Sequence, residues 1–204
     1  MHKKGNLFVV SGPSGAGKGT IVHEISKNDN DFKLSVSVTT RAPRNREIEG
    51  VNYYFKTKEE FMDMIENDEF LEYAEVYDNF YGTPKKPVLD AVEKGETILL
   101  EIDIQGALQV KKNYPEGIFI FILPPTMAEL KNRIIERGSE TDETLKKRLL
   151  SAFNEISYME KYDYFIINDV LEDSIKSFKS IIEAEKCRVI ADVKNLLKTY
   201  EEEL

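Results

Sequence analysis

Four short apolar runs, at residues 7–10, 97–102, 118–123 and 164–167, are separated by longer segments of mixed polarity. Continuous apolar runs of this length are typical of strands that are buried on both faces of a parallel sheet. Several of the intervening segments carry helical spacing of apolar residues. The pattern therefore predicts an α/β fold, in which helices cover both faces of a parallel sheet.

Two stretches interrupt this alternation and predict insertions into a single domain. Residues 34–40 alternate like a strand, the chain turns near Asn45 and Gly50, and an aromatic strand-like run follows, so residues 35–95 are expected to form a small lobe. Residues 126–161 are expected to form a helical lid, on which Arg133 and Arg137 share one helix face. The core then consists of residues 1–34, 96–125 and 162–204, and the apolar spacing over residues 173–200 predicts one or two amphipathic helices packed on it.

A glycine-rich segment follows the first apolar run directly and continues into a helical pattern. This strand, loop and helix context is the one that a P-loop requires, because successive backbone N–H groups can converge there on phosphate oxygens at a helix N-terminus. Lys18 would reach the outer phosphates of a bound triphosphate. The residues expected to bind ATP are Gly12, Pro13, Ser14, Gly15, Ala16, Gly17, Lys18, Gly19 and Thr20.

The loop departs from the strict P-loop pattern at one position. That pattern has Ser or Thr immediately after the lysine, whereas this chain has Gly19 there and its hydroxyl one place later, at Thr20. Gly19 supplies no side-chain ligand for a magnesium ion. The sequence Gly-Lys-Gly-Thr is nevertheless a familiar variant in nucleoside monophosphate kinases.

Composition and charge narrow the classes of function. At 204 residues and 41% apolar composition, the chain can bury one sizeable core. Its apolar runs are far shorter than the roughly 20 residues of a membrane span, and it begins with no signal-peptide pattern, so a cytoplasmic protein without a membrane partner is expected. A net charge of −9 argues against binding of polymeric nucleic acid. One cysteine and two histidines allow no disulfide, zinc set or Ser/His/Asp arrangement.

Polyphosphate binding by such an acidic chain must come from local clusters of arginine. One cluster lies in the predicted lobe, at Arg41, Arg44 and Arg46. The other lies in the predicted lid, at Arg133, Arg137 and Arg148. An arginine cluster alone is often only a solvated face, but two of them beside a P-loop favour a phosphate-transfer site.

The lobe carries the most specific motif, T-T-R-x-x-R-x-x-E-x-x-G-x-x-Y-x-F, which begins at Thr39. With Glu72, the Tyr81-Gly82-Thr83 triplet and the segment from Glu101 to Gly106, it resembles the guanylate kinase family over most of the chain. The resemblance implies a P-loop sheet core with a nucleotide-binding lobe and a lid. It also implies transfer of the γ-phosphoryl group of ATP to GMP, with Mg²⁺ bound together with ATP. The sequence leaves open how this ion is held, and phosphates and water, with Asp103 nearby, are the expected ligands.

The resemblance assigns roles to individual side chains. Those that match the family's ligands for the GMP phosphate are Arg41, Arg44, Tyr53 and Tyr81. Those that match its guanine-reading positions are Ser37, Glu72, Thr83 and Asp103. The residues expected to act on the transferred group are Lys18, Arg41, Arg133, Arg137 and Arg148.

Glu72 has chemistry that suits guanine. The base presents N1–H and an exocyclic amine as adjacent donors, which one carboxylate can accept together. Adenine has a bare N1 and would leave that carboxylate poorly paired. Such a mismatch in a buried site can discriminate by roughly 10⁴-fold.

Three other functions remain open from the sequence. The chain could phosphorylate AMP or a pyrimidine monophosphate, it could be a binding module that has lost catalysis, or it could be a P-loop GTPase or ATPase switch. The retained Lys18 and the paired arginines count against the second, and the lobe has no evident role in the third. The sequence leaves a monomer and a homodimer equally open.

Overall fold

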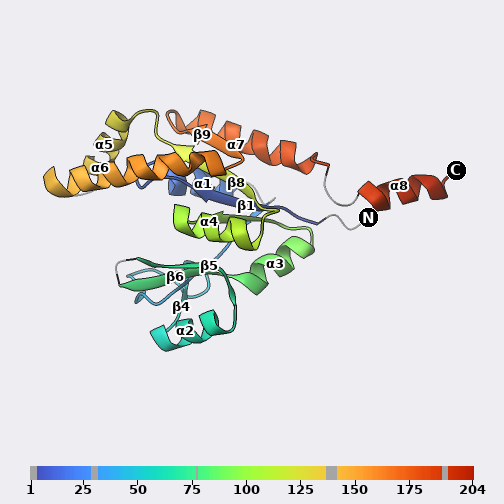
Figure 1. Cartoon of the computed structure of the whole chain (residues 1–204), viewed down its shortest axis with the longest axis horizontal. Coiled ribbons are helices and arrows are strands. Elements are labelled where there is room, and N and C mark those ends of the chain that lie inside the picture. The colour runs from blue at the N-terminus through green and yellow to red at the C-terminus, as the bar shows by residue number, and fades with distance from the viewer. Residues whose placement is uncertain (1–3, 29–31, 77, 137–141, 190–192) are drawn as a thin grey trace.

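The computed structural model describes residues 4–28, 32–76, 78–136, 142–189 and 193–204. Two sheets organise this part of the chain, one of five strands and one of four. Figure 1 shows the smaller sheet below α4 (Ile104–Asn113) and beside α3 (Lys85–Glu93). The helices α5 (Met127–Glu136) and α6 (Asp142–Ile156) lie at the opposite side of the molecule.

The larger sheet consists of β1 (Leu7–Ser11), β2 (Phe32–Leu34), β7 (Thr97–Glu101), β8 (Ile118–Leu123) and β9 (Tyr164–Ile167). Its order is β2-β7-β1-β8-β9, and all of its pairs are parallel. The four apolar runs are therefore confirmed as strands of one parallel sheet, and the predicted α/β class is correct.

Side-chain alternation along β1 divides the core into two layers. Phe8 and Val10 pack with α1 (Lys18–Asn28) and α7 (Leu171–Lys186). Leu7 and Val9 pack with α3 (Lys85–Glu93) and α4 (Ile104–Asn113) on the other face. Because each face must be apolar, the strand reads as a continuous hydrophobic run. Burial of each such side chain contributes about 1.5–3 kcal/mol.

The smaller sheet has the order β4-β3-β6-β5, formed by β3 (Val38–Thr39), β4 (Tyr54–Phe55), β5 (Phe70–Val76) and β6 (Asn79–Pro84). Its own core is Val38, Phe61 and Phe70, and Phe61 comes from α2 (Lys58–Glu66). That helix begins with a capping box, in which the Thr57 hydroxyl accepts from the Glu60 N–H and the Glu60 carboxylate accepts from the Thr57 N–H.

The alternating segment at residues 34–40 is not one strand. Leu34 ends β2 in the larger sheet, and Val38 begins β3 in the smaller one, so the chain changes sheet between them. Alternation has the same period in every sheet, and it therefore gives no sign of which sheet a residue joins.

The helices after β8 pair with each other. Leu130 and Ile134 of α5 (Met127–Glu136) pack against Leu145 and Ala152 of α6 (Asp142–Ile156), which leads into a 3₁₀ turn at Ser157–Lys161. Residues 126–161 were expected to be helical, and the described segments 127–136 and 142–161 are helical.

The tail contains two helices, in agreement with the prediction of one or two amphipathic helices over residues 173–200. Phe178 and Ile182 of α7 are buried in the core. The second helix, α8 (Val193–Glu202), stands away from the sheets in Figure 1, and its Leu197 and Tyr200 are exposed. In the described part of the chain, every helix is too short or too polar to cross a membrane.

Replacement of Phe61 by alanine tests whether the lobe has a core of its own. Phe61 is fully buried, with its ring stacked 4.5 Å from that of Phe70. We expect Phe61→Ala to lower the free energy of unfolding by about 3–5 kcal/mol, as measured by denaturant titration. Hydrogen exchange should accelerate in β3, β5 and β6 more than in β1. The exposed Phe165→Ala is the control, and equal protection losses in both sheets would contradict a separate lobe core.

Candidate active site

The glycine loop, residues 12–17, joins the end of β1 to the start of α1. Its N–H groups lie at the N-terminus of an α-helix of 11 residues, where the helix dipole favours anions. The Lys18 ammonium group donates to the carbonyl oxygens of Gly12, at 2.6 Å, and Pro13, at 3.2 Å. The lysine is therefore held over the loop, where it can meet an anion bound to the backbone.

Close packing beneath the loop requires glycine at two positions. A Cβ atom on Gly12 would lie 2.2 Å from the carbonyl oxygen of Ile122, and Gly12 has a φ of +146°. A Cβ atom on Gly17 would lie 2.2 Å from the Asn168 amide nitrogen, at a φ of +90°. Any larger residue would push the loop away from the strands that support it.

Asn168 fixes the far side of the loop. It follows β9 and is buried, and its amide group donates to the carbonyl oxygen of Ala16 at 2.8 Å. Ser174 of α7 donates to the Asn168 side-chain oxygen at 3.1 Å and so sets the orientation of the amide. The role of Asn168 could not be found from the sequence, because the contact joins residues that are 152 positions apart.

Two arginines, one from α5 and one from α6, lie beside the glycine loop. Arg148 of α6 donates to the Ser14 hydroxyl at 3.3 Å. Arg133 of α5 donates to the backbone oxygen of Asn168 at 3.0 Å and to Glu129 at 2.8 Å. The structure therefore brings both guanidinium groups to the loop from separate helices. Arg137 lies outside the described residues.

A pocket of about 270 Å³ opens between the lobe and the end of β7. It brings together five of the side chains singled out from the sequence, and these are Ser37, Tyr53, Glu72, Tyr81 and Asp103. Arg41 and Arg44 lie on the segment after β3 rather than in the lining. Glu101, to which the sequence reading assigned no role, lines the pocket as well.

Glu72 is the most unusual residue in this pocket. Only 6% of its surface is exposed, and its carboxyl group accepts a 2.6 Å hydrogen bond from the Thr83 hydroxyl. The pKa of Glu72 is raised to about 7. Burial is the main cause and the negative charge of Asp103 adds to it, while hydrogen bonding with Thr83 acts in the opposite direction. Thr83 is itself fully buried and lies behind Glu72. The side-chain contact that the structure shows for Thr83 is therefore its hydrogen bond to the Glu72 carboxyl group.

The start of α4 leaves room for Glu72. Asp103 is the N-cap of this helix, and its carboxylate accepts from the Gly106 N–H at 2.7 Å. A Cβ atom on Gly106 would lie 2.6 Å from Glu72 Oε2. Gly106, like Asn168 and Glu101, had no role assigned from the sequence, although Asp103 three residues earlier marks the start of the helix.

Arg41 is held in place before any ligand binds. Its guanidinium group forms a two-point ion pair with Glu47, with N–O distances of 2.9 and 3.0 Å, and lies 5.4 Å from the centre of the Tyr53 ring. The hydrogen bond from Arg41 lowers the pKa of Glu47. The Tyr53 and Tyr81 rings meet edge to face, 6.1 Å apart. The arrangement fixes a cation and two hydroxyl-bearing rings beside the pocket.

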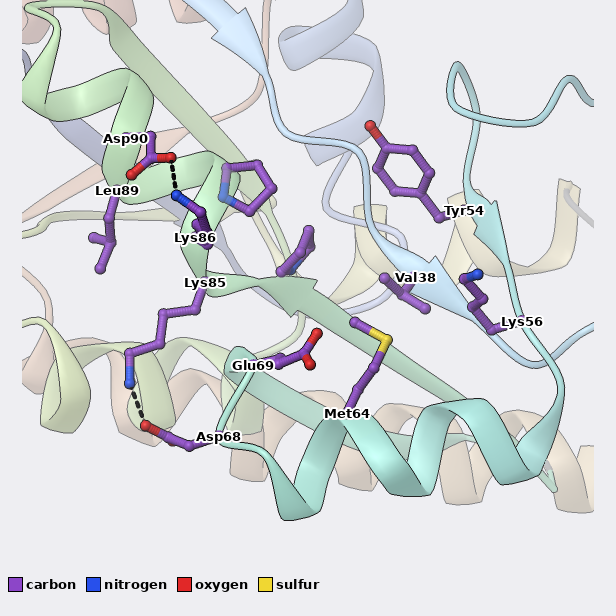
Figure 2. A pocket seen from close by; sticks show the side chains of 12 residues that line it. Val38, Tyr54, Lys56, Met64, Asp68, Glu69, Lys85, Lys86, Leu89 and Asp90 are labelled. Atoms are coloured by element: carbon purple, nitrogen blue, oxygen red, sulfur yellow. Dashed lines mark hydrogen bonds and ion pairs between the residues drawn. The ribbon is translucent and has the colours of Figure 1, made fainter.

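Figure 2 shows a different hollow, of about 780 Å³, between the lobe and α3. Its wall is mostly apolar, with Val38, Met64 and Leu89 among its residues, and its lysines Lys85 and Lys86 are paired with acidic groups. No glycine loop borders it. Its chemistry does not suit a nucleotide, although it is larger than the pocket at Glu72.

The part of the chain that the structure describes contains no ready-made cluster of metal ligands. Within it, no group of three or more His, Cys, Asp and Glu side chains could enclose a metal ion. A metal ion at this site would need oxygen atoms from a ligand as well as from the protein.

Comparison with known proteins identifies relatives over almost the whole chain. The family model described as guanylate kinase matches residues 4–185. The guanylate kinase of Clostridium acetobutylicum is 59% identical over 98% of this chain and 96% of its own, and that of Clostridium tetani is 60% identical over 92% and 89%. The crystal structure of guanylate kinase from Anaplasma phagocytophilum superimposes with a TM-score of 0.77 at 36% identity, covering 97% of this chain and 95% of that one.

The buried carboxyl group of Glu72 makes stability depend on pH. Its pKa is raised from 4.5 to about 7, so the folded protein holds a proton in that range that the unfolded chain has lost. We therefore expect the free energy of unfolding to fall by on the order of 3 kcal/mol as the pH rises from about 5 to about 8. Glu72→Gln should remove this dependence in denaturant titrations at several pH values.

The exposed Glu75→Gln, on the same strand, is the matched control for that series. The free energy of unfolding of the Glu75→Gln variant should depend on pH in the same way as that of the wild type. An identical pH profile for the Glu72→Gln variant and the wild type would show that the Glu72 carboxyl group titrates normally.

Proposed function

The chain belongs to the guanylate kinase family, and we propose that the glycine loop and the Glu72 pocket are its ATP and GMP sites. The reaction moves the γ-phosphoryl group of ATP to the phosphate of GMP and gives ADP and GDP. One observation supports the assignment of the sites most directly. A buried carboxyl group, Glu72, faces a pocket beside a P-loop, where it can accept two hydrogen bonds from guanine.

The donor nucleotide would bind along the glycine loop and the start of α1. The backbone N–H groups of residues 14–20 would hold its phosphates, and Lys18 would contact the outer ones. A space of about 280 Å³ on the other side of the loop, bordered by Gly17, Arg133 and Asn168, lies where the rest of that nucleotide could extend.

The acceptor would enter the Glu72 pocket with its base innermost. Glu72 would accept from N1–H and the exocyclic amine of guanine, Ser37 and Asp103 would complete the polar lining, and Thr83 would act through its hydrogen bond to Glu72. Binding requires the ionised carboxylate, because a protonated group offers one acceptor fewer. The raised pKa of Glu72 therefore links GMP binding to loss of a proton.

The phosphate of GMP would lie among Arg41, Arg44, Tyr53 and Tyr81. Arg41 already has its orientation fixed by Glu47, so little side-chain freedom would be lost on binding. A guanidinium group offers five N–H donors in a plane and can contact Glu47 and a phosphate together.

Phosphoryl transfer between these sites needs no general base. The acceptor phosphate has a second pKa of about 6 and is largely dianionic at neutral pH. The barrier comes from repulsion between anions and from charge on the transferred group, so catalysis would consist of alignment and electrostatic stabilisation. Lys18, Arg133, Arg137 and Arg148 would supply the positive charge, and Arg41 would bridge acceptor and donor.

We assign Mg²⁺ as the metal ion that accompanies ATP. The site has the hard oxygen donors that Mg²⁺ prefers, in the carboxylates of Glu101 and Asp103 at the end of β7. When bound, the ion neutralises phosphate charge. We propose residues 35–95 as the GMP-binding lobe and residues 126–161 as the lid, whose closure would exclude water. A cytoplasmic monomer or homodimer is consistent with this proposal.

An acceptor panel tests the proposed reaction and its nearest alternatives. ADP release from ATP should be fast with GMP and at least about 10³-fold slower, as kcat/KM, with AMP or UMP. In the Glu72→Gln variant this preference for GMP over AMP should fall by about 10²-fold or more, because the amide also presents a donor to N1–H. Glu75→Gln is the control. An unchanged preference in Glu72→Gln would exclude Glu72 from base recognition.

Replacement of Lys18 by methionine tests the donor site. The variant keeps the length and apolar stem of the side chain but removes the charge, so we expect kcat to fall by about 10³-fold or more at saturating ATP. Circular dichroism and thermal melting check that the fold is retained. The exposed Lys94→Met should have wild-type turnover. Near-normal turnover of a folded Lys18→Met variant would contradict the assigned role.

A further inference from the structure

The strand that carries Glu72 sends three consecutive side chains to three different places. Phe70 packs into the core of the smaller sheet, and Leu71 packs into the layer of the main core that contains Val9 of β1. Glu72 faces the pocket of about 270 Å³. A regular strand offers only two directions, because neighbouring side chains point to opposite faces. Strand β5 therefore departs from regular geometry beside Glu72.

A β-bulge at Leu71 supplies the third direction. Phe70 is paired with Pro84 of β6 and Glu72 with Thr83, so Leu71 is an extra residue on β5. An extra residue of this kind bends a strand and changes the direction of the side chains next to it. It brings Glu72 opposite Thr83, whose hydroxyl donates to it at 2.6 Å. A bulge also interrupts the ladder of hydrogen bonds, so the backbone at Glu72 needs support from another element.

Helix α4 gives that support from the open edge of β5. This strand is the last in the order β4-β3-β6-β5, and α4 lies alongside it (Figure 1). The Gln109 side chain accepts from the Tyr73 N–H at 3.1 Å and donates to the Tyr73 carbonyl oxygen at 2.9 Å. The Asn113 amide donates to the Leu71 carbonyl oxygen at 2.8 Å. The peptide groups before and after Glu72 are therefore both held by α4.

One face of α4 makes all of these contacts. Gly106, Gln109 and Asn113 are spaced by three and four residues, which places them in a row along the helix. Gly106 leaves the room that the Glu72 carboxyl group occupies, since a Cβ atom there would lie 2.6 Å from Glu72 Oε2. The helix that makes space for the carboxyl group thus also fixes the backbone that carries it.

We propose that Gln109 is a positioning residue for base recognition, which holds the Tyr73 backbone so that the Glu72 carboxylate can meet N1–H and the exocyclic amine of guanine together. This inference rests on the proposed function, in which Glu72 reads the base. Gln109 lies outside the lining of the pocket and acts through the main chain of β5.

Burial of Leu71 holds β5 to the core but does not orient it. Apolar contact depends on buried area and has no preferred direction, whereas a hydrogen bond weakens steeply as its angle departs from linear. The two bonds of Gln109 meet both polar groups of one backbone residue, as a neighbouring strand would, and so fix the rotation of the strand. Recognition of two donors by one carboxylate needs such precision, because a misplacement of about 1 Å can cost about 10²-fold in rate.

Kinetics with GMP and IMP test this role. IMP lacks the exocyclic amine of guanine, so the ratio of kcat/KM for GMP to that for IMP reports the second hydrogen bond to Glu72. Gln109→Met keeps the length of the side chain and removes both of its hydrogen bonds. We expect this variant to lower the ratio by about tenfold, chiefly through a higher KM for GMP, while the KM for ATP stays within about twofold of the wild-type value.

A double-mutant cycle with Glu72→Gln separates positioning from a general loss of structure. Because Gln109 acts through the Glu72 carboxylate, Gln109→Met should change the ratio by less than about twofold once that carboxylate has been replaced. Circular dichroism and thermal melting check that each variant is folded. The exposed Lys112→Met, on the same helix, is the control and should keep the wild-type ratio.

The outcomes separate this inference from the proposed function. A folded Gln109→Met variant with the wild-type ratio would overturn the role of Gln109. So would an equal loss of kcat/KM with GMP and IMP, or a tenfold effect that persists in the Glu72→Gln background. An unchanged ratio in Glu72→Gln alone would contradict base recognition by Glu72, and this result is obtained before Gln109 is changed.

Discussion

The parallel pairing of β1 with β7 on one side and β8 on the other is the constraint on which the rest of the site depends. Parallel strands end at the same edge of a sheet, so the glycine loop after β1 meets Glu101 and Asp103 at the end of β7. The same pairing gives the loop its floor, the Ile122 carbonyl oxygen under Gly12. The proposed donor and acceptor sites are adjacent because of backbone hydrogen bonds, before any side-chain chemistry is considered.

The pocket proposed as the acceptor site adds a second constraint, which acts against the stability of the fold. Glu72 is buried without a cationic partner among the described residues and is supported by the Thr83 hydroxyl and by the space that Gly106 leaves. An unpaired buried carboxyl group is costly, and the raised pKa of Glu72 expresses that cost. Guanine can relieve it by donating two hydrogen bonds to the ionised group. Under the proposed function, the site would therefore gain selectivity from a feature that lowers the stability of the free protein.

The sequence predicted the features of the fold and the site that depend on neighbouring residues, but not those that depend on contacts between distant residues. Four core strands and the glycine loop could be predicted because apolar runs and glycine spacing are local signals. The change of sheet between Leu34 and Val38 could not, since alternation is the same in either sheet. Asn168 supports the loop through a contact between residues that are 152 positions apart, which no spacing rule reports. The side-chain roles rested on a family motif, and the structure brings most of those residues together.

The central claim is that one edge of the sheet holds two nucleotide sites that face each other. The most direct measurement is calorimetric binding of a dinucleoside polyphosphate in which a chain of phosphates joins adenosine to guanosine. One molecule should bind per chain, more tightly than ATP or GMP, and should displace both, because the second contact is made within one complex. Displacement of only one of the two nucleotides, with no gain in affinity, would contradict facing sites.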